Sequence, residues 1–261
     1  MNITQAYLNR LGPSLSDRDL AIARVVGRFK IMTGDQLERL FFDHCSDTSR
    51  ARNRQQVLKR LTQRQVLGLA GQRRIGGARG GSAQAIFTLD IAGQHLAEMT
   101  GNRPRRPYSW YEPTIEHFLA VAELYVQLME AERSGDILKL LAYDPEPYCW
   151  RDFGADTLKP DAYVELAVEH QGQRYRGSLF IEVDRANQYG AKISSKLPQY
   201  VSYYRHHRAV TPGQTFPRIV FLAPDERRVR YLTGLLDDRA EVRQLFHVGL
   251  LSEPLPALLQ R

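Results

Sequence analysis

The chain is poor in cysteine and contains no long apolar run and no internal repeat. Its 261 residues include two cysteines, Cys45 and Cys149, which lie far apart and without a second Cys pair, so neither a disulfide framework nor a zinc site is indicated. No apolar run approaches the length of a membrane-spanning helix, and residues 1–20 lack the apolar region of a signal peptide. We therefore expect a cytoplasmic protein with no membrane partner.

Positive charge is distributed unevenly along the chain, whose formal net charge is +7. Residues 1–107 hold 18 Lys and Arg against 8 Asp and Glu, a net charge of +10, whereas residues 108–261 hold 18 against 21, a net charge of −3. This asymmetry predicts a polyanion-binding module followed by a region with another role, and double-stranded DNA is the first candidate partner. The alternative is a basic surface that serves only solubility.

The N-terminal region has the order of elements that is typical of a winged helix-turn-helix domain. Capping patterns and apolar stripes predict helices near residues 16–30, 33–41 and 48–64, the third capped by Thr48 or Ser49. Strands are expected at 66–73 and 85–89, joined by a glycine-rich basic loop. In such a domain the third helix enters the major groove and the loop follows phosphate. The expected DNA contacts are Arg50, Arg52, Arg54, Lys59, Arg73, Arg74, Arg79, Arg105 and Arg106.

Composition divides the chain into two domains joined by a linker. Residues 1–102 form the predicted winged-helix DNA-binding domain, unless that domain serves protein contacts instead. Residues 103–111 contain prolines and paired arginines, which favour an extended connector. Residues 112–261 form the second domain, with a long amphipathic helix at 113–133 and later strands at 138–143, 147–153, 218–223 and 242–248.

The centre of the second domain contains a predicted hairpin, residues 162–169 and 174–184, with a tight turn at Gln171 and Gly172. The period of two places Glu182 and Asp184 on the same face of the second strand. Asp161 begins the partner strand at the same edge, so three carboxylates are expected to converge there. Such hard oxygen ligands suit Mg²⁺ or Mn²⁺.

A helix is expected at residues 187–208, after the hairpin. Lys192, Lys196 and Tyr200 would lie along one stripe, and a neighbouring apolar stripe would pack on the sheet. Pro198 removes a backbone donor from this run, so a kink or a break is expected near Ser194, with Pro198 in the first turn of a restarted helix.

These motifs resemble those of a known group of proteins. The order of helix, strands, Pro-Asp, hairpin, Glu-Val-Asp and Lys/Tyr helix is similar to the PD-(D/E)xK nuclease group, and the whole chain more closely resembles the plasmid replication-relaxation family. The motif residues are Leu158, Pro160 and Asp161, then Phe180, Glu182 and Asp184, then Lys196 and Tyr200. The architecture matches nearly end to end, whereas the motif covers only the central stretch.

The resemblance implies an α/β fold: a winged helix followed by a restriction-endonuclease-like domain with a mixed central sheet. It also implies a DNA-binding protein of a plasmid or other mobile element, linked to replication and relaxation of plasmid DNA. By this resemblance Asp161 and Glu182 hold a Mg²⁺ or Mn²⁺ ion, and Glu116 is an outer ligand. Where the nuclease motif has lysine this chain has Asp184, so Lys196 or Lys192 would supply the ammonium from the helix.

Two functions follow from this pattern. One is a magnesium-dependent DNA nickase or endonuclease in which Asp161 and Glu182 bind the ion, Asp184 assists and Lys196 stabilises charge. The other is a non-catalytic replication initiator or transcriptional regulator whose nuclease-like domain mediates dimerisation or partner binding. A homodimer suits either, because winged-helix proteins often bind paired half-sites. An RNA-acting protein is less favoured, because no stretch resembles an aromatic stacking platform.

Each site residue also has a structural interpretation. Asp161 could be a turn residue, and Glu182 and Asp184 could form ion pairs. The tyrosines are most often packing residues, although a nucleophilic Tyr200 would suit a relaxase-like transesterification. Relaxases of the common kind use a His cluster as their metal site, whereas His206 and His207 stand alone here and are better explained as a solvated helix end.

Overall fold

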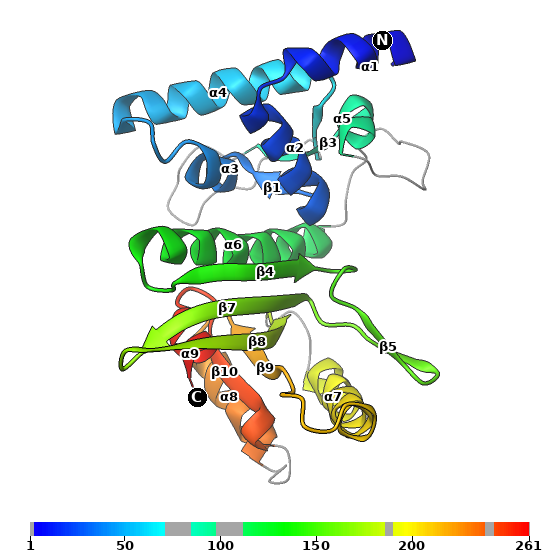
Figure 1. Ribbon diagram of the computed structural model, residues 1–261, viewed down its shortest axis with the longest axis vertical. Coiled ribbons are helices and arrows are strands. Elements are labelled where there is room, and N and C mark those ends of the chain that lie inside the picture. Colours follow the sequence, from blue (N-terminus) through cyan, green and yellow to red (C-terminus); the bar gives the residue numbers. More distant parts are fainter. Residues whose placement is uncertain (1–2, 71–84, 98–111, 186–189, 238–242, 261) are drawn as a thin grey trace. The chain divides into compact units, whose positions relative to one another are not determined.

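The structure is a computed structural model that describes residues 3–70, 85–97, 112–185, 190–237 and 243–260; for residues 47, 112, 113, 170 and 190–195 it describes the backbone alone. Helices and strands alternate along much of the chain (Figure 1), which confirms the predicted α/β class. Contacts divide the chain into two compact units, Met1–Val126 and Gln127–Arg261, and the division falls inside α6 (Glu112–Ser134). The linker expected at residues 103–111 lies outside the described residues.

The first unit combines short helices with a small antiparallel sheet. The sheet has the order β1-β3-β2, in which Met32 pairs with Phe87 and Leu67 pairs with Leu89. Its elements before α6 are α1 (Gln5–Leu11), η1 (Gly12–Ser14), α2 (Asp17–Phe29), β1 (Met32–Thr33), α3 (Gly34–Phe41), α4 (Asp47–Gln63), β2 (Leu67–Leu69), β3 (Ile86–Leu89) and α5 (Ile91–Leu96).

The starts of α2 and α3 follow the predicted capping chemistry. Ser16 at the start of α2 and Thr33 at the start of α3 form capping boxes with Asp19 and Gln36. The prediction for α4 was wrong, because its N-cap is Ser46 rather than Thr48 or Ser49. The hydroxyl of Ser46 lies 2.8 Å from that of Ser49, so the serines and threonine near this helix end interact with one another.

The second unit is built on a mixed five-stranded sheet of order β10-β9-β8-β7-β4, with a separate two-stranded hairpin, β5-β6. Strands β8, β9 and β10 are parallel, and β7 is antiparallel to both β8 and β4. The elements are β4 (Lys139–Pro145), β5 (Arg151–Phe153), β6 (Asp156–Leu158), β7 (Ala162–His170), β8 (Gln173–Val183), α7 (Gly190–Val210), β9 (Arg218–Ala223), α8 (Glu226–Asp237), η2 (Arg243–Leu245), β10 (Phe246–Leu250) and α9 (Leu255–Leu259).

The central hairpin has the predicted turn. Gln171 and Gly172 both adopt positive φ, and His170 pairs with Gln173 on either side of them. Two consecutive residues with positive φ match the right-handed twist of the flanking strands, which fixes the register of β7 against β8. That register positions the candidate site at the opposite end of the hairpin.

Helix α7 is not interrupted at its proline. It runs from Gly190 to Val210 with Pro198 inside, so one of the two expected outcomes, a break near Ser194 with a restarted helix, was wrong. Proline removes one backbone hydrogen bond, but Leu197 and Tyr200 on either side are buried in the core. Packing of these side chains therefore holds the helix across the missing donor.

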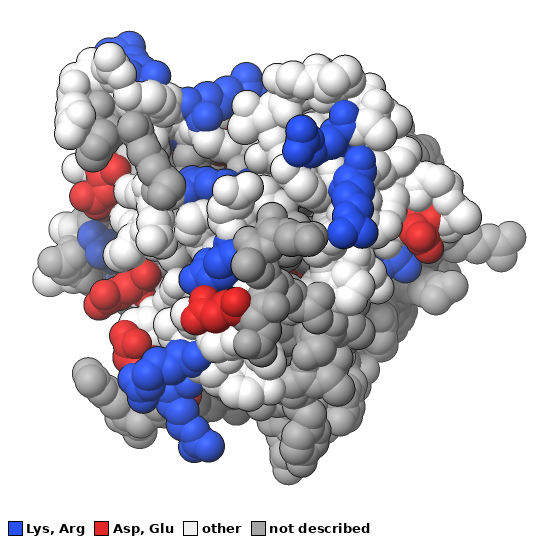
Figure 2. Space-filling model, turned by 90° about the horizontal axis from the view of Figure 1, so that it is seen from below, with Lys and Arg blue, Asp and Glu red and all other residues white. Residues whose placement is uncertain are grey.

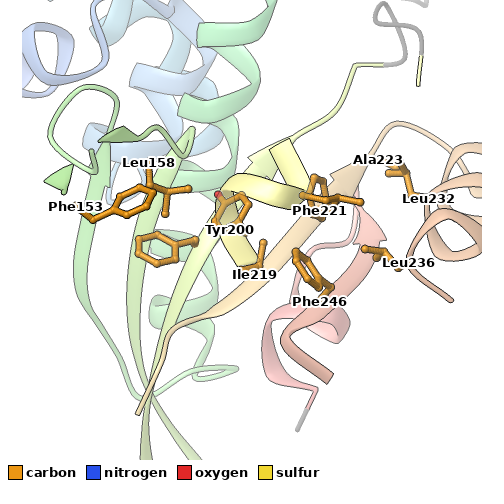
Figure 3. Packing of buried hydrophobic residues seen from close by; sticks show 11 residues of the cluster. Phe153, Leu158, Tyr200, Ile219, Phe221, Ala223, Leu232, Leu236 and Phe246 are labelled. Carbon is orange, nitrogen blue, oxygen red and sulfur yellow. The ribbon is translucent and has the colours of Figure 1, made fainter. Parts of the chain in front are cut away.

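One core cluster of the second unit lies between the sheet and helices α7 and α8. Phe180, Ile219 and Phe221 from the strands meet Leu197 and Tyr200 from α7 and Leu232 and Leu236 from α8. Figure 3 shows Phe153 and Leu158 of the β5-β6 hairpin in the same cluster, close to Tyr200. The hairpin is thereby anchored to the core although it extends beyond the sheet in Figure 1.

Candidate functional site

The register of β7 and β8 brings two predicted site residues face to face. Ala162 pairs with Ile181, and the amide of Asp161 donates to the carbonyl of Ile181 at 3.0 Å. One step further along the antiparallel pair, Asp161 therefore lies opposite Glu182, and the two side chains share a face of the sheet. Both residues are buried.

Helix α7 supplies the other half of this cluster. The ammonium of Lys196 donates to Glu182 Oε2 and lies 3.5 Å from Asp161 Oδ1. The hydroxyl of Tyr200 donates to Glu182 Oε1 at 2.8 Å. Because Lys196 and Tyr200 are four apart, one helix face reaches the carboxylates twice. The predicted stripe of lysine and tyrosine is present at these two positions; for Lys192 only the backbone is described.

All four carboxylate oxygens of Asp161 and Glu182 have a donor or a cation beside them. Asp161 Oδ2 accepts from the amide of Val183 at 2.7 Å, and its Oδ1 faces Lys196. Glu182 accepts from Tyr200 on one oxygen and from Lys196 on the other. A buried carboxylate needs such partners, because burial without them is costly.

The electrostatics of the cluster follow from two acids around one base. Burial, and then repulsion by Asp161, raise the pKa of Glu182 to about 8, although Lys196 acts in the opposite direction. Burial by itself would lower the pKa of Lys196, but Glu182 and Asp161 together raise it above its ordinary value. Burial and the neighbouring Glu182 raise the pKa of the Tyr200 hydroxyl well above its ordinary value. Tyr200 is therefore protonated and acts as a hydrogen-bond donor.

Asp184 belongs to a different pairing. Its amide continues the parallel ladder by donating to Leu222 at 2.9 Å, and its carboxylate accepts from Arg228 of α8. Among the described residues, no group of three or more His, Cys, Asp or Glu side chains is placed to hold a metal ion. The expected convergence of three carboxylates is therefore not found there: Asp161 and Glu182 meet at Lys196, and Asp184 pairs with Arg228.

A buried thiol fixes the chain just before Asp161. The Sγ atom of Cys149 donates to the carbonyl of Pro160 at 2.9 Å. Burial, and then the charge of Asp161, raise the pKa of Cys149 to about 12, so the group is a neutral thiol. Cys149 thus connects the loop before β5 to Pro160, the residue just before Asp161. Glu116, the expected outer ligand, lies on α6 in the first unit.

The basic residues of α4 fall into two groups. Arg50 donates to the carbonyls of Asp43 and Cys45, and Arg54 forms an ion pair with Glu38 at 2.9 Å. Arg52 and Lys59 are exposed. The remaining residues expected to contact DNA, Arg73, Arg74, Arg79, Arg105 and Arg106, lie outside the described residues.

Two parts of this geometry were missed from the sequence. The pairing of Arg228 with Asp184 was not expected, although α8 follows a strand parallel to β8 and so begins near the end of that strand. The aromatic residues Tyr148 and Trp150 were also overlooked, because the short strands around them have no clear period.

Comparison with known proteins gives one match. A family model described as replication-relaxation matches residues 24–219, which is most of the chain. Searches of curated proteins and of solved structures gave no match. None of the described helices is both long and apolar enough to span a membrane.

Proposed function

The chain belongs to the replication-relaxation family, and on this premise we propose that it binds double-stranded DNA of a plasmid or other mobile element and acts in its replication or relaxation. The first unit would bind the duplex as a winged helix, and the second would act on the bound strand. The exposed face of α4 is the observation that supports DNA binding most directly.

This face consists of residues three and four apart, which share one side of a helix. Arginine and lysine contact phosphate or guanine, and glutamine can pair with adenine, so the composition suits a helix in the major groove. The buried or paired neighbours Arg50 and Arg54 would hold the helix rather than contact DNA. The exposed residues of the stripe are Thr48, Arg52, Gln55, Gln56, Lys59 and Gln63.

The test uses a variant with both Arg52→Ala and Lys59→Ala. Its affinity for duplex DNA is measured by fluorescence anisotropy at a series of salt concentrations. Each lost phosphate contact should lower the slope of log affinity against log salt by about 0.9. The matched control is Arg174→Ala, an exposed cation on β8. Equal affinity and slope for the double variant and the wild type would remove α4 from the interface.

For the second unit, we propose magnesium- or manganese-dependent cleavage of one DNA strand at Asp161, Glu182 and Lys196. Asp161 Oδ1 and Glu182 Oε2 converge on one point, which now receives the Lys196 ammonium. Two hard oxygens that face a single cation fit Mg²⁺, which takes its other ligands from water and phosphate. The bound ion would displace the Lys196 ammonium from this point and neutralise charge on the phosphate, and the displaced Lys196 would stabilise the charge that develops there.

Cleavage is tested with supercoiled plasmid and the Asp161→Asn variant, which keeps the shape of the side chain. The variant should lose nicking in Mg²⁺ or Mn²⁺ and retain duplex binding. Asp237→Asn, an exposed acid at the end of α8, is the matched control and should nick normally. Nicking at the wild-type rate by Asp161→Asn would exclude this site.

The second candidate function is a non-catalytic initiator or regulator whose second unit mediates dimerisation or partner binding. The observation in its favour is that every carboxylate oxygen of the pair already has a partner in the protein. Salt-sensitive duplex binding by a wild-type protein that nicks plasmid in no divalent metal would favour this function over cleavage.

A further inference from the structure

The β5-β6 hairpin presents an aromatic surface on a rigid base. Phe153 and Leu158 point into the core (Figure 3), and the ring of Phe153 packs edge-on against Tyr203 at a centroid distance of 5.2 Å. Arg151 pairs with Leu158, so the neighbouring positions, Trp150 and Lys159, lie on the opposite, outer side. The core therefore fixes the position of the outer residues.

Two aromatic side chains at the start of this hairpin are exposed. Trp150 is 39% exposed, and Tyr148, in the turn just before it, is 57% exposed. Large aromatic side chains are usually buried to a greater extent, so two exposed ones together indicate a binding surface. The Lys159 ammonium lies 4.8 Å from the centre of the Trp150 ring. We call Tyr148, Trp150 and Lys159 the aromatic platform.

The platform adjoins the carboxylate pair. Lys159 precedes Asp161 by two residues, and Cys149, between the two aromatics, is bonded to Pro160. The amide of Tyr148 donates to Pro145 and that of Trp150 donates to Pro147, so the turn that holds both rings is hydrogen-bonded. A ligand on the platform would therefore lie next to Asp161.

Charge around the platform is nearly balanced. Lys159 and Arg151 are opposed by Glu146, Asp152 and Asp156 on the same segment. Figure 2 shows one face of the molecule, on which the described basic side chains form separate groups with acidic ones among them. Duplex DNA is bound chiefly through its phosphates, so this surface does not suit a duplex backbone. Aromatic rings stack unpaired bases of any sequence, and single-strand sites add cations that follow the backbone, a role that Lys159 can fill.

We propose that the aromatic platform binds an unpaired strand of DNA, with bases stacked on Trp150 and Tyr148 and Lys159 at a phosphate. This inference rests on the proposed DNA function and names its substrate class: the second unit takes hold of single-stranded DNA beside Asp161 and Glu182, whereas the first unit holds the duplex. A protein that relaxes or replicates plasmid DNA meets unpaired strands at a nick or a melted origin.

The test uses the full-length chain with Trp110→Phe, so that Trp150 is the only tryptophan. Short oligothymidylate should quench the Trp150 fluorescence, and a duplex of the same length should not. In anisotropy titrations, Trp150→Ala should weaken binding of the single strand by about tenfold, within the range known for one stacked base. Lys159→Gln should lower the salt slope by about 0.7.

The matched control is Tyr231→Ala on α8. Tyr231 is 44% exposed, and the Arg228 guanidinium lies 4.9 Å from its ring centre. It is therefore also an exposed aromatic residue beside a cation, but outside the platform. This variant should bind the single strand like the wild type. Loss of binding in Tyr231→Ala equal to that in Trp150→Ala would contradict a specific platform.

Two results would overturn the inference. One is an unchanged Trp150 signal with oligothymidylate; the other is equal single-strand affinity of Trp150→Ala and the wild type. The proposed function is tested separately. It fails if the wild-type protein does not bind duplex DNA, or if Arg52→Ala with Lys59→Ala leaves duplex binding unchanged. Intact duplex binding with no binding of single strands would therefore reject the platform alone.

Discussion

Lys196 on α7 donates a hydrogen bond to Glu182 at the end of β8, and its ammonium also lies 3.5 Å from Asp161. One lysine ammonium therefore contacts two buried carboxylates. With both acids ionised the group would be left with a net negative charge and little water to solvate it. A proton on the carboxylate pair removes that charge, which is the physical reason for the raised pKa of Glu182.

The first prediction concerns stability against pH. The pKa of Glu182 rises from 4.5 to about 8 on folding, so the folded state holds a proton that the unfolded state releases. The contribution of Glu182 to stability is therefore complete below about pH 4.5 and is lost as pH rises to about 8. Urea unfolding should show this loss in the wild type and not in Glu182→Gln. Equal pH dependence of stability in both proteins would contradict the raised pKa of Glu182.

The second prediction concerns the cation between the carboxylates. Lys196→Gln removes the resident ammonium and leaves Asp161 and Glu182 to repel each other, so the variant should unfold at lower urea than the wild type. Mn²⁺ can replace the lost charge, and a ligand that binds only the folded state stabilises it. Mn²⁺ should therefore raise the urea midpoint of Lys196→Gln more than that of the wild type.

The control for this variant is Lys139→Gln, which removes an exposed cation bonded to Glu132. Mn²⁺ should have the same effect on it as on the wild type. A midpoint of Lys196→Gln that does not respond to Mn²⁺ would show that the two carboxylates do not form a cation site even when the ammonium is absent.

The third prediction separates a structural Tyr200 from a nucleophilic one. Tyr200 is 1% exposed and donates to Glu182, and its raised pKa opposes the ionised form that attack on phosphate requires. Tyr200→Phe leaves a buried carboxylate oxygen without its donor, which should cost about 1–3 kcal/mol of unfolding free energy. Nicking, if present in the wild type, should persist. A covalent DNA adduct at Tyr200 would refute this.

Local patterns were sufficient to predict the centre of the candidate site. The period of two and the turn at Gly172 gave the register that puts Asp161 opposite Glu182, and helical spacing put Lys196 and Tyr200 on one face. These relationships depend on residues close in sequence or on a single hairpin. Their geometry follows from the regular spacing of side chains along one strand or one helix, so a sequence pattern can predict it.

Contacts between distant elements were not predictable in this way. Asp19 is almost fully buried, and Arg60, on another helix, donates to both of its carboxylate oxygens, although both residues are of surface type by pattern. Strand β1 has two residues and β6 three, which is too short for an alternation to be recognised. The pairing of Asp184 with Arg228 likewise depends on how α8 returns to the sheet.

The fourth prediction compares two helical glycines. At Gly93 in α5, an added Cβ would lie 2.0 Å from the carbonyl oxygen of Val66, a contact that backbone must move to relieve. At Gly234 in α8, an added Cβ would meet nothing within 4 Å. Gly93→Ala should therefore lower the unfolding free energy by at least about 2 kcal/mol. Gly234→Ala should raise it by about 0.5–1 kcal/mol, because alanine has less backbone freedom to lose.

The same substitution is thus expected to act in opposite directions in the two units. Circular dichroism during urea unfolding measures both. The first variant should also weaken duplex binding, because the start of α5 donates backbone hydrogen bonds to Gln65, two residues after α4 ends, and so supports that helix. Gly93→Ala with wild-type stability would mean that α5 does not approach Val66 so closely. The α4 face would then lack the support on which the proposed duplex interface depends.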